Sequence, residues 1–115
     1  MSKLSRTKGH GYERTVANDL KPIFPKAKRH LEYQSQEAEA GQDLDNTKPF
    51  LIQTKRYHKY VNPSKIEEIK PIPGQYQVLI TKADHKPAIV CMYYEDWKEI
   101  LNILKLNGVL PTPKE

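Results

Sequence analysis

The chain has 115 residues, of which 37% are hydrophobic, so it can bury one core but is too short for two. No apolar run approaches the roughly 20 residues that a membrane span needs, and the first residues lack the apolar core of a signal peptide. The single cysteine excludes an internal disulfide and a cysteine zinc site, and we therefore expect a cytoplasmic protein with no membrane partner.

The net charge is +5, and the excess of basic side chains is N-terminal. Residues 1–30 contain eight Lys and Arg against two Asp and Glu, whereas the remaining 85 residues contain eleven against twelve. Such clustering favours a polyanionic partner, nucleic acid in particular. Charge that serves only solubility is the simpler alternative.

A basic arm and a helix are expected at the N-terminus. Residues 1–10 are polar and basic, and we expect them to be mobile. A helix should begin around Gly11, because Tyr12, Val16 and Leu20 recur every fourth residue and form one apolar face. Two prolines shortly after Leu20 should end it.

Glu13 lies in line with Ala17 and Leu20, at the edge of this apolar face. Burying a lone carboxylate is costly, so Glu13 needs a partner. It forms an ion pair with Arg14 or a nearby lysine, or it lies in a frayed first turn, or it points inward at a metal site.

The next part of the chain predicts a strand, a loop and a short helix. Residues 28–34 fit a first strand, and the polar residues 35–41 fit a loop. Asn62 followed by proline is a typical helix start, and it predicts a short helix over 64–70.

The C-terminal half predicts two strands and an amphipathic helix. The strands are expected over 75–81 and 88–94, both buried, and the helix over 95–107. Residues 109–115 should form a disordered tail. Together the elements predict a single α/β domain over 1–115, with a central mixed sheet of about five strands flanked by helices.

Two short strands with a tight turn between them, near residues 43 and 53, carry the most distinctive side chains. Side chains alternate along a strand, so Asp43 and Asp45 should share one face, as should Gln53 and Lys55. Bringing both pairs to the same side requires a hairpin in which Asp43 lies opposite Gln53 and the loop is formed by 47–49.

These residue types suit a hard metal ion and a phosphate. Asp43, the side-chain oxygen of Gln53 and the backbone carbonyl of Thr54 could hold Mg²⁺, which would activate water and offset charge on a phosphate. Lys55 could position the water or stabilise the phosphate. The alternative is a hairpin with ordinary surface polar residues.

The parts in this order resemble the PD-(D/E)XK nuclease superfamily, and more narrowly the archaeal-type Holliday junction resolvases and their phage-borne relatives. The resemblance covers roughly residues 5–100. It rests on a basic segment leading into a helix with a glutamate, then Gly-x-Asp-aliphatic at 41–44, then an apolar strand over 50–56. In the family this strand ends in an acidic residue, any residue and lysine, often with a further base, and here it ends in Gln53-Thr-Lys55-Arg56.

The resemblance implies a restriction-endonuclease-like fold and a magnesium-dependent endonuclease, with Mn²⁺ as a substitute. It implies that Glu13, Asp43 and Gln53 hold the metal and that Lys55 is catalytic. It also implies a homodimer that resolves a four-way DNA junction by two symmetric nicks.

Gln53 departs from the pattern, because the family usually has Glu or Asp there. Glutamine keeps an oxygen ligand but removes a negative charge, which should weaken metal affinity or abolish activity. Asp45 is either a supporting group or the true ligand. Two rival functions follow: a less structure-specific nicking or restriction-like nuclease, and a DNA-binding protein that kept the fold and lost catalysis.

Contacts to DNA are expected from basic side chains at the N-terminus and after the Gln53–Lys55 strand. The candidates are Arg6, Lys8, Arg14, Arg29, Arg56, His58 and Lys59. The alternative for 56–60 is a solvated loop whose tyrosines pack on the sheet. His30, His58 and His85 could each be a general base or a ligand, but we expect each to be solvated or to contact phosphate.

Overall fold

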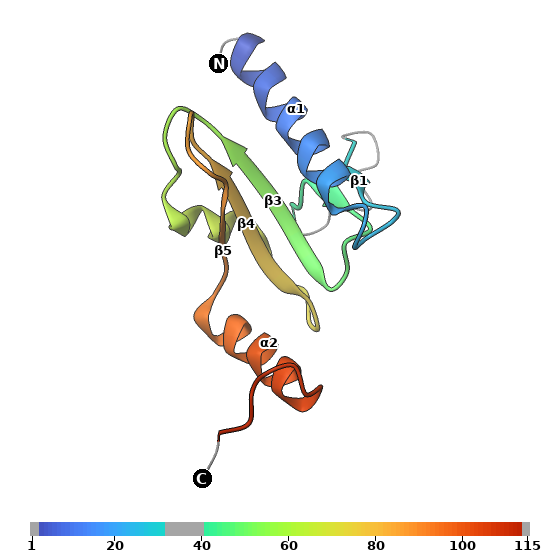
Figure 1. Ribbon diagram of the computed structural model, residues 1–115. Coiled ribbons are helices and arrows are strands. Elements are labelled where there is room, and N and C mark those ends of the chain that lie inside the picture. Colours follow the sequence, from blue (N-terminus) through green and yellow to red (C-terminus); the bar gives the residue numbers. More distant parts are fainter. Residues whose placement is uncertain (1–2, 32–40, 114–115) are drawn as a thin grey trace.

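The computed structural model describes residues 3–31 and 41–113, and it has an α/β architecture (Figure 1). In chain order the elements are α1 (Lys3–Leu20), β1 (Lys28–Arg29), β2 (Leu44–Asp45), β3 (Phe50–Arg56), the 3₁₀-helix η2 (Pro63–Glu68), β4 (Tyr76–Lys82), β5 (Ile89–Cys91) and α2 (Tyr94–Leu106). Apart from Gly41, the predicted loop over 35–41 lies outside the described residues, as do the last two residues of the predicted tail.

The central sheet has three strands in the order β3-β4-β5. β3 and β4 are parallel, with Ile52 beside Val78, and β5 is antiparallel to β4. β1 and β2 form a separate antiparallel pair. The strands are therefore of mixed direction, but they form two sheets where the sequence predicted a single sheet of about five strands. Parallel neighbours cannot be joined by a tight turn, and residues 57–75 supply the crossover between β3 and β4.

Alternating side chains of β3 and β4 form a buried cluster on each face of the central sheet. The face toward α1 contains Val16, Ala17, Leu44, Ile52 and Val78. The face toward η2 contains Leu51, Ile66, Ile69 and Leu79. The predicted short helix over 64–70 is present as a 3₁₀-helix that ends earlier, at Glu68. Asn62 caps it, as predicted, by accepting a hydrogen bond from Ser64 N at 2.9 Å.

The first helix is longer than predicted. α1 begins at Lys3, so the expected start around Gly11 is wrong, although its end at Leu20 is confirmed. The first ten residues contain no proline, and a single glycine within them costs only about 1 kcal/mol of helix propensity, so the helix can extend from Gly11 back to Lys3.

The C-terminal elements are more exposed than predicted. The expected strand over 88–94 is present as β5, but it covers only Ile89–Cys91. Its predicted burial is wrong, because Ile89 and Val90 are exposed. α2 matches the predicted helix, but none of its residues is buried, and Figure 1 shows it extending away from the sheet. Among the described residues, no helix combines the length and apolar character that crossing a membrane requires.

Candidate functional site

Asp43 lies along the open edge of β3, the strand that has β4 on its other side. Its backbone N–H donates to the Ile52 carbonyl at 2.8 Å, and its carboxylate Oδ2 accepts a hydrogen bond from Thr54 N at 2.8 Å. On the other side, His30 N donates to the Asp43 carbonyl at 2.7 Å. Asp43 is therefore fixed by hydrogen bonds of both its backbone and its side chain.

The predicted hairpin register is wrong. Asp43 pairs its backbone with Ile52, one residue away from the predicted partner Gln53, and the regular ladder of β2 is with β1, where Leu44 lies opposite Arg29. Leu44 is buried beneath α1, in the same cluster as Ile52 of β3. The Asp43 carboxylate still reaches β3, because the Thr54 N–H points out of the sheet edge toward it.

Gln53 and Lys55 share the face of β3 that is turned toward η2, as strand alternation predicts. Leu51, two residues earlier, packs with η2 on this face, and the Lys55 ammonium lies 3.1 Å from the Glu68 carboxylate of η2. Gln53 is only 7% exposed, and its Oε1 is buried without a hydrogen-bond partner. A buried amide oxygen with no partner is unusual, and it is free to accept a ligand.

The pKa values of the two carboxyl groups near Lys55 are shifted in opposite directions. Burial raises the pKa of Asp43; the Thr54 N–H and the Lys55 charge partly offset this, and the Glu68 charge adds to it. Hydrogen bonding by Lys55 is the largest cause that lowers the pKa of Glu68, and Lys65 contributes to the same effect. Asp43, Lys55 and Glu68 therefore form one electrostatic group at the edge of β3.

Glu68 was not predicted as a site residue. Nothing in the sequence distinguishes it from Glu67, because a short helix on the surface commonly carries both. Only the crossover that places η2 over β3 brings Glu68 beside Lys55.

Asp45 does not join this group. His30 Nδ1 lies 3.1 Å from both carboxylate oxygens of Asp45, and both side chains are almost fully buried. The expectation that His30 is solvated or contacts phosphate is therefore wrong.

Glu13 forms an ion pair with Arg29, whose Nε lies 3.3 Å from Glu13 Oε2. Glu13 thus has an ion-pair partner, but the partner is Arg29 of β1, and the predicted pairing with Arg14 or a nearby lysine is wrong. In the described part of the chain, no group of three or more His, Cys, Asp or Glu side chains is placed to hold a metal ion. Glu13, Asp43 and Glu68 therefore do not form one all-carboxylate site, and the role of Glu13 as a ligand stays a prediction.

The predicted DNA contacts differ in their surroundings. Arg14 and Lys59 are exposed. Arg56 and His58, at the carboxyl end of β3, both contact Asp84, at 3.3 and 2.6 Å. The side chains of Arg6 and Lys8 lie outside what the structure describes.

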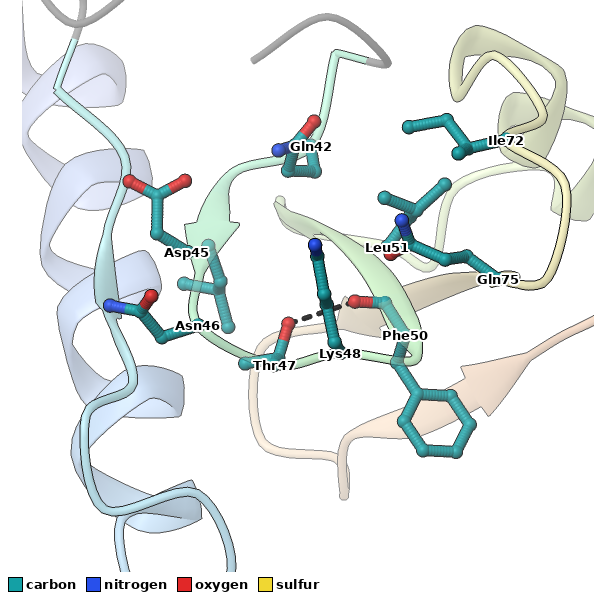
Figure 2. A pocket seen from close by; sticks show the side chains of 10 residues that line it. Gln42, Asp45, Asn46, Thr47, Lys48, Phe50, Leu51, Ile72 and Gln75 are labelled. Carbon is teal, nitrogen blue, oxygen red and sulfur yellow. Dashed lines mark hydrogen bonds between the residues drawn. The ribbon is translucent and has the colours of Figure 1, made fainter. Parts of the chain in front are cut away.

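A hollow of about 460 Å³ lies between the turn before β3 and the segment before β4 (Figure 2). Its lining includes Gln42, Asp45, Leu51, Ile72 and Gln75, and the three residues of the Asp43 group lie outside it. Since Leu51 and Gln53 share a face of β3, the hollow opens at the opposite end of that face from Lys55.

Comparison with known proteins found no matching family model, no matching curated protein and no matching solved structure.

Proposed function

We propose that this chain is a Mg²⁺-dependent endonuclease that nicks four-way DNA junctions. The observation that supports this most is the 2.8 Å hydrogen bond from Thr54 N to the Asp43 carboxylate. It joins the acidic residue of the nuclease pattern to the strand that carries Gln53 and Lys55, although the hairpin register expected for them is absent.

The donor set fits a hard divalent cation. Asp43 offers a carboxylate, and Gln53 offers a buried amide oxygen without a partner. The Thr54 carbonyl points the same way as its N–H, toward Asp43, because both groups of one strand residue face the same edge. Mg²⁺ binds one or two carboxylates plus neutral oxygens and keeps several waters, and when bound it would activate water and offset charge on the phosphate.

Lys55 contributes a positive charge beside Asp43. Its ion pair with Glu68 holds the ammonium group at the edge of β3, where it can contact an oxygen of the scissile phosphate. Exposed bases such as Arg14 and Lys59 would bind neighbouring phosphates. Two copies of the chain would present two such sites, which suits paired nicks in opposite strands.

The test is a nicking assay in Mg²⁺ on a four-way junction and on a linear duplex of the same sequence. We expect wild type to cut the junction, and Lys55→Ala to lose about 100-fold or more of the rate, as removal of a charge-stabilising donor does. Lys98→Ala on α2, an exposed lysine paired with Glu95, is the matched control and should cut normally. Equal cutting of the linear duplex would favour the less structure-specific nuclease.

A second candidate is a DNA-binding protein of the same fold without catalysis. Gln53 favours it, because this neutral side chain stands where the related nucleases have a carboxylate. In the same assay this candidate predicts junction binding without nicking by wild type.

A further inference from the structure

Glu68 lies at the centre of the charged group on the η2 face of β3. One carboxylate oxygen is 3.1 Å from the Lys55 ammonium, and the other is 3.4 Å from that of Lys65. The Glu68 backbone is also close to the segment that carries Asp43, because a Cβ added at Gly41 would lie 3.2 Å from the Glu68 carbonyl oxygen. The chain thus packs the end of η2 directly against the start of the Asp43 segment.

On this face β3 itself carries no carboxylate, but it does carry an amide oxygen without a hydrogen-bond partner. Gln53 is 7% exposed, with its Oε1 buried and unpartnered, and strand alternation turns it to the side of Lys55 and η2. A carboxylate at position 53 would give a divalent cation two charged ligands together with Asp43. Glutamine leaves Asp43 alone on β3's edge, so the second charge has to come from another element.

We propose that Glu68 supplies the second carboxylate of the divalent-cation site, together with Asp43 and the amide oxygen of Gln53. This inference rests on the proposed function. It assigns to η2 the negative charge that β3 lacks because residue 53 is glutamine. Two carboxylates and an amide oxygen form a ligand set that Mg²⁺ and Mn²⁺ both accept. Without the ion, the ammonium groups of Lys55 and Lys65 each contact one carboxylate oxygen of Glu68. A bound ion would compete with them for these oxygens.

The test is calorimetric titration of the full chain with Mn²⁺ in the absence of DNA. We expect wild type to bind, Asp43→Asn to abolish binding, and Glu68→Gln to weaken it about tenfold or more, since losing a ligand should cost at least as much as losing a group that only supports one. Glu67→Gln is the matched control, since Glu67 is an exposed acid on the same short helix, and it should bind as wild type does. Circular dichroism confirms that each variant is folded.

A double variant separates ligation from an indirect effect through Lys55. Returning the carboxylate to the strand, in Gln53→Glu with Glu68→Gln, should restore most of the lost Mn²⁺ affinity. Unchanged affinity in Glu68→Gln, or no recovery in the double variant, would overturn the role of Glu68 while leaving the nuclease proposal standing. If wild type binds no Mn²⁺ at all, the metal-dependent function itself fails, and this inference fails with it.

Discussion

Asp43 is subject to opposing electrostatic effects. Burial beside β3 raises the pKa of its carboxyl group, while the Thr54 N–H and the Lys55 ammonium lower it by less. The folded, metal-free protein therefore holds the Asp43 proton more tightly than the unfolded chain does. A divalent cation bound here would lower the pKa of Asp43, since it favours the charged carboxylate.

The pKa of Asp43 predicts how the stability of the metal-free protein depends on pH. Its folded pKa lies above the ordinary value of 3.8, so the native state binds more protons, and stability should fall as pH rises between the two values. Asp43→Asn keeps an acceptor for Thr54 N and should remove this fall, which makes the variant more stable than wild type above the interval but not below it.

Melting temperatures measured in EDTA between about pH 3 and pH 8 would reveal this difference. Asp19→Asn, at an exposed position of α1, is the control and should keep the wild-type slope. A slope in Asp43→Asn equal to that of wild type would contradict the prediction.

At the scale of elements, β3 and β4 organise the site. They are parallel along their whole length, from Phe50 beside Tyr76 to Arg56 beside Lys82, and helices cover both faces. The crossover between them brings η2 over the Gln53–Lys55 side. Asp43 is added at the free edge of β3 by two hydrogen bonds. The site therefore depends on the packing of the central strand pair.

Leu79 in β4 should be the strongest single contributor to this packing. It is 0% exposed and lies in the cluster beneath η2, so Leu79→Ala should lower the free energy of unfolding by about 2–5 kcal/mol through lost burial and a cavity. Leu106→Ala at the end of α2, where Leu106 is 77% exposed, should change it by less than about 0.5 kcal/mol. Urea denaturation followed by circular dichroism measures both, and similar losses would argue that α2 is packed.

At the scale of the whole molecule, α2 is a helix whose apolar side chains are not buried by the rest of the chain. Trp97, Ile103 and Leu106 are 44–77% exposed, and no residue of the helix is buried. An amphipathic helix this exposed needs a partner surface. A second copy is the partner that the proposed paired nicking requires.

We therefore expect wild type to sediment with twice the 13.4 kDa mass of one chain, and Trp97→Asp with Ile103→Asp to sediment as a monomer. Placing charge on an apolar interface costs enough to dissociate a small dimer. Glu95→Gln, on an exposed position at the start of α2, is the control and should remain dimeric. A monomeric wild type would remove α2 as the dimer surface.

The sequence by itself determined much of the local structure. The Leu20 end of α1, the β3 and β4 strands, the Asn62 cap and the bounds of α2 all follow from short-range patterns of apolar, proline and capping residues. Strand alternation likewise placed Gln53 and Lys55 on one face. These features depend on neighbours within a few residues, which the sequence states directly.

The tertiary structure decided which distant elements meet. The parallel pairing of β3 with β4, the contact of Glu68 with Lys55, the burial of His30 against Asp45 and the Glu13–Arg29 pair all join residues well separated in the chain. Each depends on how the buried clusters pack on the two faces of the sheet. The sequence shows which residues are apolar enough to be buried, but it does not show which of them contact one another. For the same reason Asp43 forms its hydrogen bonds with Ile52 and Thr54 of β3, whereas the alternation of side chains along the strands had predicted that it lies opposite Gln53.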